Sequence, residues 1–85
     1  MNPAIFNRVQ GIMADLFSIP VAQVMLETSS DTIKSWDSLQ HLNLMLALEQ
    51  EFGVQFAPEE IETLTSVQSI IQLLNLKLQA AEKAL

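Results

Sequence analysis

Asp37, Ser38 and His41 stand close together and are the residue types of an acyl-transfer triad. On one helix Ser38 and His41 could approach each other, but a triad also needs an acid on the far imidazole nitrogen and an oxyanion hole. Asp37 is better placed to cap the helix that begins here, and no glycine-rich turn supplies paired backbone donors. The sequence therefore predicts a protein that is not an enzyme, with His41 as a surface or boundary residue of its helix.

Other kinds of site lack the residues they need. The chain has one histidine and no cysteine, which predicts no metal site and no thiol nucleophile of its own. Its two glycines, Gly11 and Gly53, cannot form a phosphate-cradling loop. Ser38 remains, because a serine in the first turn of a helix lies beside unpaired N–H groups and the positive end of the helix dipole, where an attached phosphate is held favourably. The same position also suits a serine that does no more than start a helix.

The elements that must position Ser38 begin with an amphipathic helix. Asn2 is predicted to cap it and Pro3 to be its first residue, and residues 18–20 end it because Pro20 disfavours helix. A long connection over residues 18–36 follows. Its apolar residues are expected to anchor it to the core; they are Val21, Val24, Met25, Leu26 and Ile33.

The remaining pattern is also helical. A second helix is predicted from the Asp37 cap, with Gln40 in the capping-box position, to a stop at Gly53. Pro58 opens a short third helix, and the capping box of residues 65–68 opens the last one. The predicted fold class is all-α, a small four-helix bundle with three main helices, one short third helix and a long loop after the first. Its core is expected to contain Val9, Ile12, Leu16, Leu48, Phe52, Val67, Ile70 and Leu74.

Length and composition limit the class of protein. Eighty-five residues, 49% of them hydrophobic, suit one domain over residues 1–85 and are too apolar for a disordered chain. The sequence predicts no membrane span and shows no secretory signal at its start, so a cytoplasmic location is expected.

Charge is concentrated in the middle of the chain. Of a net charge of −6, eight acidic residues and one lysine lie between Glu27 and Glu62. This balance argues against nucleic acid as a partner and could steer basic partners toward the central segment. A solvated acidic surface that only aids solubility would look the same.

Four motifs in register resemble the acyl carrier protein family over about residues 33–74. They are the Asp37-Ser38-Leu39 triplet at a helix start, the Leu48-Glu49-Gln50-Glu51-Phe52 helix end, the Pro58-Glu59-Glu60 turn and the Thr65-Ser66-Val67 opening of the last helix. The resemblance implies a right-handed four-helix bundle. It also implies that Ser38, flanked by Asp37 and Leu39, carries 4′-phosphopantetheine donated from coenzyme A by a phosphopantetheinyl transferase. The arm's thiol would then hold cargo as a thioester, loaded by an acyl ligase or acyltransferase and passed to downstream biosynthetic enzymes.

Departures from the fatty acid synthesis carriers point to a specialised pathway. Those carriers usually have acids at the positions of Gln40 and Asn43, and glycine rather than Ser35 in the triplet's lead-in, whereas this chain has Trp36 directly before Asp37. The Trp-Asp-Ser-Leu form resembles stand-alone, monomeric carriers of polysaccharide, lipid or polyketide-like assembly. A discrete aminoacyl carrier is a variant of this reading, and a helical adaptor with an acidic docking face and no covalent arm is the alternative.

The second helix carries more apolar residues than one buried stripe requires. Either it is the central member of the bundle, or part of the surplus lines an acyl cavity and part forms a docking surface. The residues expected to dock partners are Leu39, Leu42, Asn43, Leu46, Glu49, Gln50, Glu59 and Glu60, with Glu51 and Glu62 nearby. With Gln40 and Asn43 in place of acids, docking is expected to rest more on apolar contact than on charge.

Overall fold

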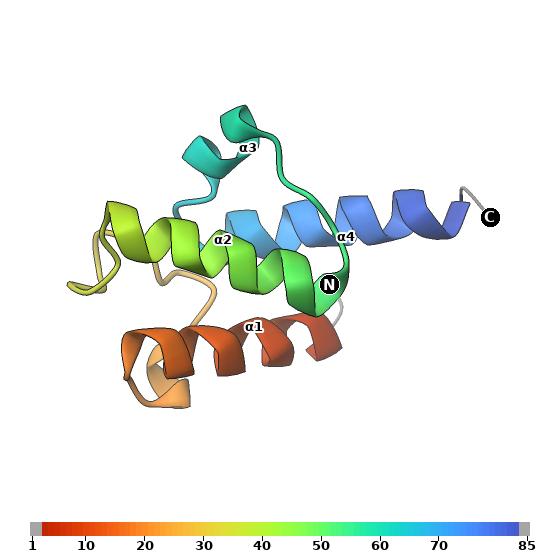
Figure 1. The fold of residues 1–85 in the computed structure, drawn as a ribbon. Helices are drawn as coiled ribbons and strands as arrows, with labels where there is room; N and C mark the ends of the chain where they lie inside the picture. The colour runs from red at the N-terminus through yellow and green to blue at the C-terminus, as the bar shows by residue number, and fades with distance from the viewer. Residues whose placement is uncertain (1–2, 84–85) are drawn as a thin grey trace.

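The computed structural model describes residues 3–83, which form four α-helices and a short 3-10 helix, η1. They are α1 (Pro3–Phe17), η1 (Val21–Gln23), α2 (Ser38–Phe52), α3 (Pro58–Thr63) and α4 (Val67–Lys83). Helix α1 runs opposite to α2 and α4 and packs against both, while the short α3 lies on the side of α2 and α4 that faces away from α1 (Figure 1). The predicted all-α bundle with a short third helix and a long first loop is confirmed.

Helix α1 ends where the sequence indicates, through a left-handed turn at Ser18. Ser18 has φ 56°, and the N–H of Ile19 donates to the Ala14 carbonyl at 3.1 Å, which is the Schellman pattern. Pro20 then prevents the helix from resuming. The predicted cap Asn2 lies outside the described residues.

The buried stripe of α1 is rotated from the predicted one. Val9 is fully buried as expected, but Ile12 and Leu16 are only half-buried and pack at the edge of the core. Met13 and Phe17 are buried at the centre of the core instead. Each lies one residue after a predicted core residue, Ile12 or Leu16, because the buried face of α1 is displaced by one residue. The other five predicted core residues are buried; they are Leu48, Phe52, Val67, Ile70 and Leu74.

The long connection is anchored at fewer points than predicted. Val24 and Ile33 are buried and Leu26 packs against the core, but Val21 and Met25 are about half exposed, so their assignment as anchors is wrong. Val21 lies in η1, which has no buried residue, and Met25 follows the buried Val24 two residues after η1 ends.

Polar contacts hold the rest of the connection. Buried Thr28 accepts from the Met25 N–H and donates to the Gln23 carbonyl at 3.0 Å, and the Thr28 carbonyl accepts from the N–H of Val67. These bonds tie the connection to the start of α4.

Helix α4 starts one residue later than the predicted capping box. Ser66, not Thr65, is the cap: its Oγ accepts from the Ser69 N–H, and Ser69 Oγ accepts from the Ser66 N–H, both at 3.2 Å. Thr65 is held outside the helix because its carbonyl accepts from the N–H of Ser30 at 2.9 Å. The loop contact therefore shifts the helix start.

Candidate functional site

The first turn of α2 is fixed by Asp37. Its backbone is extended and its Oδ1 accepts from the Gln40 N–H at 2.9 Å, while its carbonyl accepts from the His41 N–H at 2.8 Å. At the other end Gly53, with φ 66°, closes α2 in the left-handed conformation. Both predicted ends of α2 are confirmed, and Asp37 is occupied as a cap.

Ser38 is the first residue of α2 and is exposed. Within residues 3–83 no hydrogen bond occupies its hydroxyl, and none occupies the N–H groups of Ser38 and Leu39. The free N–H groups and the helix dipole both favour an anion at this point. The geometry thus offers a free hydroxyl where an attached phosphate would be stabilised.

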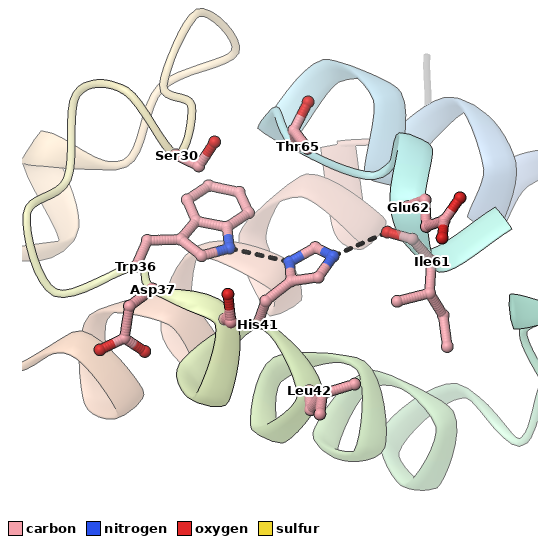
Figure 2. Close-up of a pocket in the computed structure, with 9 residues that line it drawn as sticks. Ser30, Trp36, Asp37, His41, Leu42, Ile61, Glu62 and Thr65 are labelled. Atoms are coloured by element: carbon pink, nitrogen blue, oxygen red, sulfur yellow. Dashed lines mark hydrogen bonds between the residues drawn. The ribbon is translucent and has the colours of Figure 1, made fainter. Parts of the chain in front are cut away.

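His41 is not free to activate Ser38, because both ring nitrogens have other partners (Figure 2). The Trp36 indole N–H donates to His41 Nδ1 at 2.9 Å, and His41 Nε2 lies 2.7 Å from the Ile61 carbonyl. An indole nitrogen can only donate, so Nδ1 accepts and Nε2 carries the proton that is donated to Ile61. His41 is half-buried, as expected for a boundary residue, and the triad is not assembled.

Gln40 and Asn43, the neutral residues of the helix start, form a hydrogen-bonded pair. Gln40 Nε2 donates to the Leu16 carbonyl in the last turn of α1 at 3.2 Å, and Asn43 Nδ2 donates to Gln40 Oε1 at 2.8 Å. A carboxylate at position 40 could not donate to Leu16. Sequence reasoning missed this link, since nothing local indicates that the end of α1 lies beside α2.

The apolar surplus of α2 divides between core and solvent. Leu44 and Leu48 are fully buried, whereas Leu39, Leu42 and Leu46 are 69%, 52% and 56% exposed. A surface helix does not need three exposed leucines for its packing. These three lie in the turns of α2 that follow Ser38.

Two acids near the end of α2 are used inside the fold. Glu49 is half-buried and its Oε2 accepts from the Phe56 N–H at 2.8 Å. Glu51 pairs with Arg8 of α1, whose guanidinium also lies 4.5 Å from the centre of the Phe52 ring. The Glu49 carboxylate therefore stabilises the loop after α2, and the Glu51 carboxylate stabilises the contact of α2 with α1.

In α3, Glu60 is also committed to the fold. Its Oε1 accepts from the Ala57 N–H at 2.8 Å and lies 3.0 Å from Lys77 Nζ of α4. The backbone hydrogen bond and then Lys77 lower the pKa of the Glu60 carboxyl. The other predicted docking residues outside α2's leucines are exposed; they are Asn43, Gln50 and Glu59.

A cavity of about 570 Å³ opens beside Ser38. It lies between the first turns of α2, the end of α3 and the loop that precedes α2, as Figure 2 shows. Its lining residues are Ser30, Trp36, Asp37, Ser38, His41, Leu42, Ile61, Glu62 and Thr65.

Two kinds of feature are absent from the described residues. In the part of the chain that the structure describes, no three His, Cys, Asp or Glu side chains are grouped so that they could hold a metal ion. Over residues 3–83, no helix combines the length and apolarity that crossing a membrane would require.

The family model for a phosphopantetheine attachment site matches residues 7–74, which include the exposed serine at the start of α2. The chain belongs to the acyl carrier protein family. It is 38% identical over 76 residues to an acyl carrier protein of Thermosynechococcus vestitus, covering 89% of this chain and 94% of that one. It is 35% identical over 74 residues to an acyl carrier protein of Petrotoga mobilis, covering 87% of each. A third, from Clostridium acetobutylicum, is 33% identical over 67 residues, covering 79% of this chain and 87% of that one.

As a member of this family, the chain is a non-catalytic carrier that bears 4′-phosphopantetheine covalently and interacts with modifying and biosynthetic enzymes. The adaptor without an arm is thereby set aside. The arm supplies a terminal thiol on which an acyl group is held as a thioester. The residues fit such a group, because the start of α2 combines a free hydroxyl with two free N–H groups, and a cavity adjoins it.

Proposed function

We propose that Ser38 is the residue to which the phosphopantetheine arm is attached. The observation that carries the proposal is the free, exposed hydroxyl of Ser38 at a helix start whose own cap is supplied by Asp37. Asp37 orders the turn without occupying Ser38, and the exposed Leu39 gives the transferase an apolar contact beside the hydroxyl. Of the serines in the nearby loop, Ser29 and Ser30 are half-buried, and the exposed Ser35 lies before the helix start.

The test is an intact-mass measurement after incubation with coenzyme A and a broad-specificity phosphopantetheinyl transferase. The natural chain should gain one phosphopantetheinyl mass, and Ser38→Ala should gain none while keeping its helical circular dichroism. Ser35→Ala, which removes an exposed serine three residues earlier, is the matched control and should be modified like the natural chain. A gain of mass by Ser38→Ala would refute the assignment.

Partner enzymes are proposed to dock on the exposed leucines of α2. We define the docking surface as Leu39, Leu42 and Leu46, with Asn43, Gln50 and Glu59 at its margin. Glu49 and Glu60 are supporting residues in this proposal, since both carboxylates are bonded within the fold. The partners are a phosphopantetheinyl transferase, a loading ligase or acyltransferase, and the enzymes that use the cargo.

Apolar contact should dominate this docking. Burying one leucine contributes ~1.5 to 3 kcal/mol, whereas an exposed ion pair contributes ~0 to 1 kcal/mol. Leu46→Ser should therefore lower kcat/KM of the transferase by about tenfold or more. Glu59→Gln and moderate salt should change it only a few-fold. Leu76→Ser, an equally exposed leucine on α4, is the control and should leave it unchanged. Equal losses for Leu46→Ser and Leu76→Ser would contradict this docking surface.

A specialised pathway is supported by the neutral helix start. At positions 40 and 43, where carriers of fatty acid synthesis have acids, this carrier has Gln40 and Asn43. The two side chains are bonded to each other, and Gln40 is also bonded to α1. We further propose a monomer with one domain over residues 1–85 that works in the cytoplasm, where coenzyme A-dependent loading enzymes act. Fatty acid synthesis enzymes should use it poorly. Elongation as efficient as on a dedicated fatty acid carrier would contradict the pathway assignment and leave the carrier role intact.

A further inference from the structure

The cavity beside Ser38 is separated from the hydrophobic core by Trp36. The indole lines the cavity, yet it is 4% exposed and belongs to the buried core. One neighbour is Phe17 of α1, with ring centres 5.6 Å apart, and another is His41, with ring centres 6.0 Å apart. Trp36 is thus a wall between the cavity and the interior.

Two hydrogen bonds hold this wall in place. The Trp36 indole N–H donates to His41 Nδ1, and His41 Nε2–H donates to the Ile61 carbonyl, as Figure 2 shows. The bridge joins three elements, namely the loop before α2, α2 itself and α3. A chain of methylenes that passed from the cavity into the core beside Trp36 or His41 would separate one of these pairs. It would leave a buried polar group without a partner, which is costly.

Outside the wall, the cavity offers hydrogen-bonding groups. Ser30, Glu62 and Thr65 are its polar lining residues beyond the helix start, and no hydrogen bond among the described residues occupies the Glu62 carboxylate. The apolar part of the lining comes from Leu42 and Ile61. The lining as a whole is mostly apolar, so its few polar residues could hold one polar substituent of a group, while the wall limits how long that group can be.

We infer that the Trp36–His41–Ile61 bridge keeps the cargo out of the core, and that this carrier takes short acyl groups bearing hydrogen-bond donors. Trp36 and His41 are positioning residues in this scheme, because they act by closing the interior. The inference rests on the proposed attachment at Ser38 and adds to it the class of cargo. Attachment at Ser38 is tested by the mass of the carrier, whereas the class of cargo is tested by whether the cargo disturbs Trp36 and the core.

The test loads three acyl groups onto the natural chain by supplying the transferase with butyryl-, 3-hydroxybutyryl- and dodecanoyl-coenzyme A. Intact mass first establishes loading at Ser38, so a failure there refutes the proposed function. NMR of the loaded forms then follows the Trp36 indole N–H, and amide hydrogen exchange follows α3 and the core. Butyryl and 3-hydroxybutyryl are matched in length and differ in one hydroxyl.

We expect 3-hydroxybutyryl to shift the resonances of Ser30, Glu62 and Thr65 more than butyryl does. Dodecanoyl should leave the indole N–H and the core exchange rates as they are in the carrier with a free thiol. In His41→Leu, which removes both bonds, dodecanoyl should enter and slow exchange in α2 and α3, while Leu76→Ala, a control on the exposed face of α4, should behave as the natural chain. Contacts of dodecanoyl methylenes with Leu44 or Leu48 in the natural chain would overturn the inference. Equal shifts from butyryl and 3-hydroxybutyryl would overturn the polar preference.

Discussion

Helices α2 and α4 both have a serine at their start, as the first residue of α2 and as the cap of α4, and the two helix starts differ in which hydrogen-bonding groups they leave free. At α4, Ser66 caps the helix and exchanges hydrogen bonds with Ser69, whose Oγ lies 3.0 Å from that of Ser66. At α2, Asp37 is the cap, and Ser38 follows it as the first helical residue with its hydroxyl exposed. Ser66 is thus used to cap its helix, whereas the Ser38 hydroxyl has no hydrogen bond within the described residues.

The backbone differs in the same way. The N–H groups of Val67 and Gln68 at the start of α4 donate to the Thr28 and Leu26 carbonyls of the long loop at 2.9 and 3.2 Å. No such loop covers the start of α2 within the described residues, where the N–H of Ser38 is free. A serine at a helix start is thus available for covalent attachment only where another residue supplies the cap and no segment covers the turn. We refer to the start of α2 as the open start and to that of α4 as the closed start.

The largest expected effect is on the free energy of unfolding, at a core residue of α4, the helix with the closed start. Ile70→Ala should lower the free energy of unfolding by ~2 to 5 kcal/mol, because Ile70 is fully buried and its truncation leaves a cavity. Leu46→Ala, on the exposed face of α2, should change it by less than ~0.5 kcal/mol. Urea denaturation measures both. If Ile70→Ala unfolded together with the natural chain, the packing of α4 described above would be wrong.

Removing each serine should sharpen the contrast between the two starts. Ser66→Ala removes a cap and should cost ~0.5 to 2 kcal/mol, and Ser69→Ala should cost part of the same amount. Ser38→Ala should cost no more than a few tenths of a kcal/mol, because Asp37 keeps the cap and alanine favours helix. Thermal melts followed by circular dichroism compare the variants. A loss at Ser38→Ala as large as at Ser66→Ala would show that Ser38 is structural.

The smallest effect is expected at α3, which Glu60 ties to α4. The pKa of Glu60 is lowered in the folded chain by the Ala57 N–H and by Lys77, so its contribution to stability is present above the ordinary value of 4.5 and is lost as the pH falls through the folded value. Glu60→Gln should therefore be less stable than the natural chain at pH 7 and equal to it in strong acid. Glu59→Gln, an exposed neighbour, serves as the control. A difference for Glu60→Gln that did not change with pH would contradict this assignment.

Much of the fold follows from local sequence signals. Asp37 and Gly53 fix the ends of α2 because a cap and a left-handed residue act within one turn. The start of α4 could not be placed to the residue, since the bond from Ser30 to the Thr65 carbonyl comes from a distant loop. Which apolar residue of α1 is central depends likewise on where its neighbours pack.

The site divides in the same way. Ser38 can be predicted from its helix start and its motif, both of which are local. The Trp36–His41–Ile61 bridge joins residues up to 25 positions apart across three elements, and the Gln40–Leu16 bond spans 24 positions. Only the packing of the elements brings these groups together, so the sequence carried no signal for them. That position 40 is a glutamine can be read from the sequence, but that its side chain bonds to Leu16 cannot.

The most direct measurement maps the modification on the chain itself. No lysine or arginine lies between Lys34 and Lys77, so trypsin alone leaves Ser38 and Ser66 in one peptide, and a second cleavage after glutamate separates them. Fragmentation of these peptides after incubation with coenzyme A and the transferase locates the added mass. It should lie on Ser38 alone, with Ser35 in the same peptide and Ser66 in another both unmodified. Modification of Ser66, or of any serine in place of Ser38, would contradict the account of the open and closed starts.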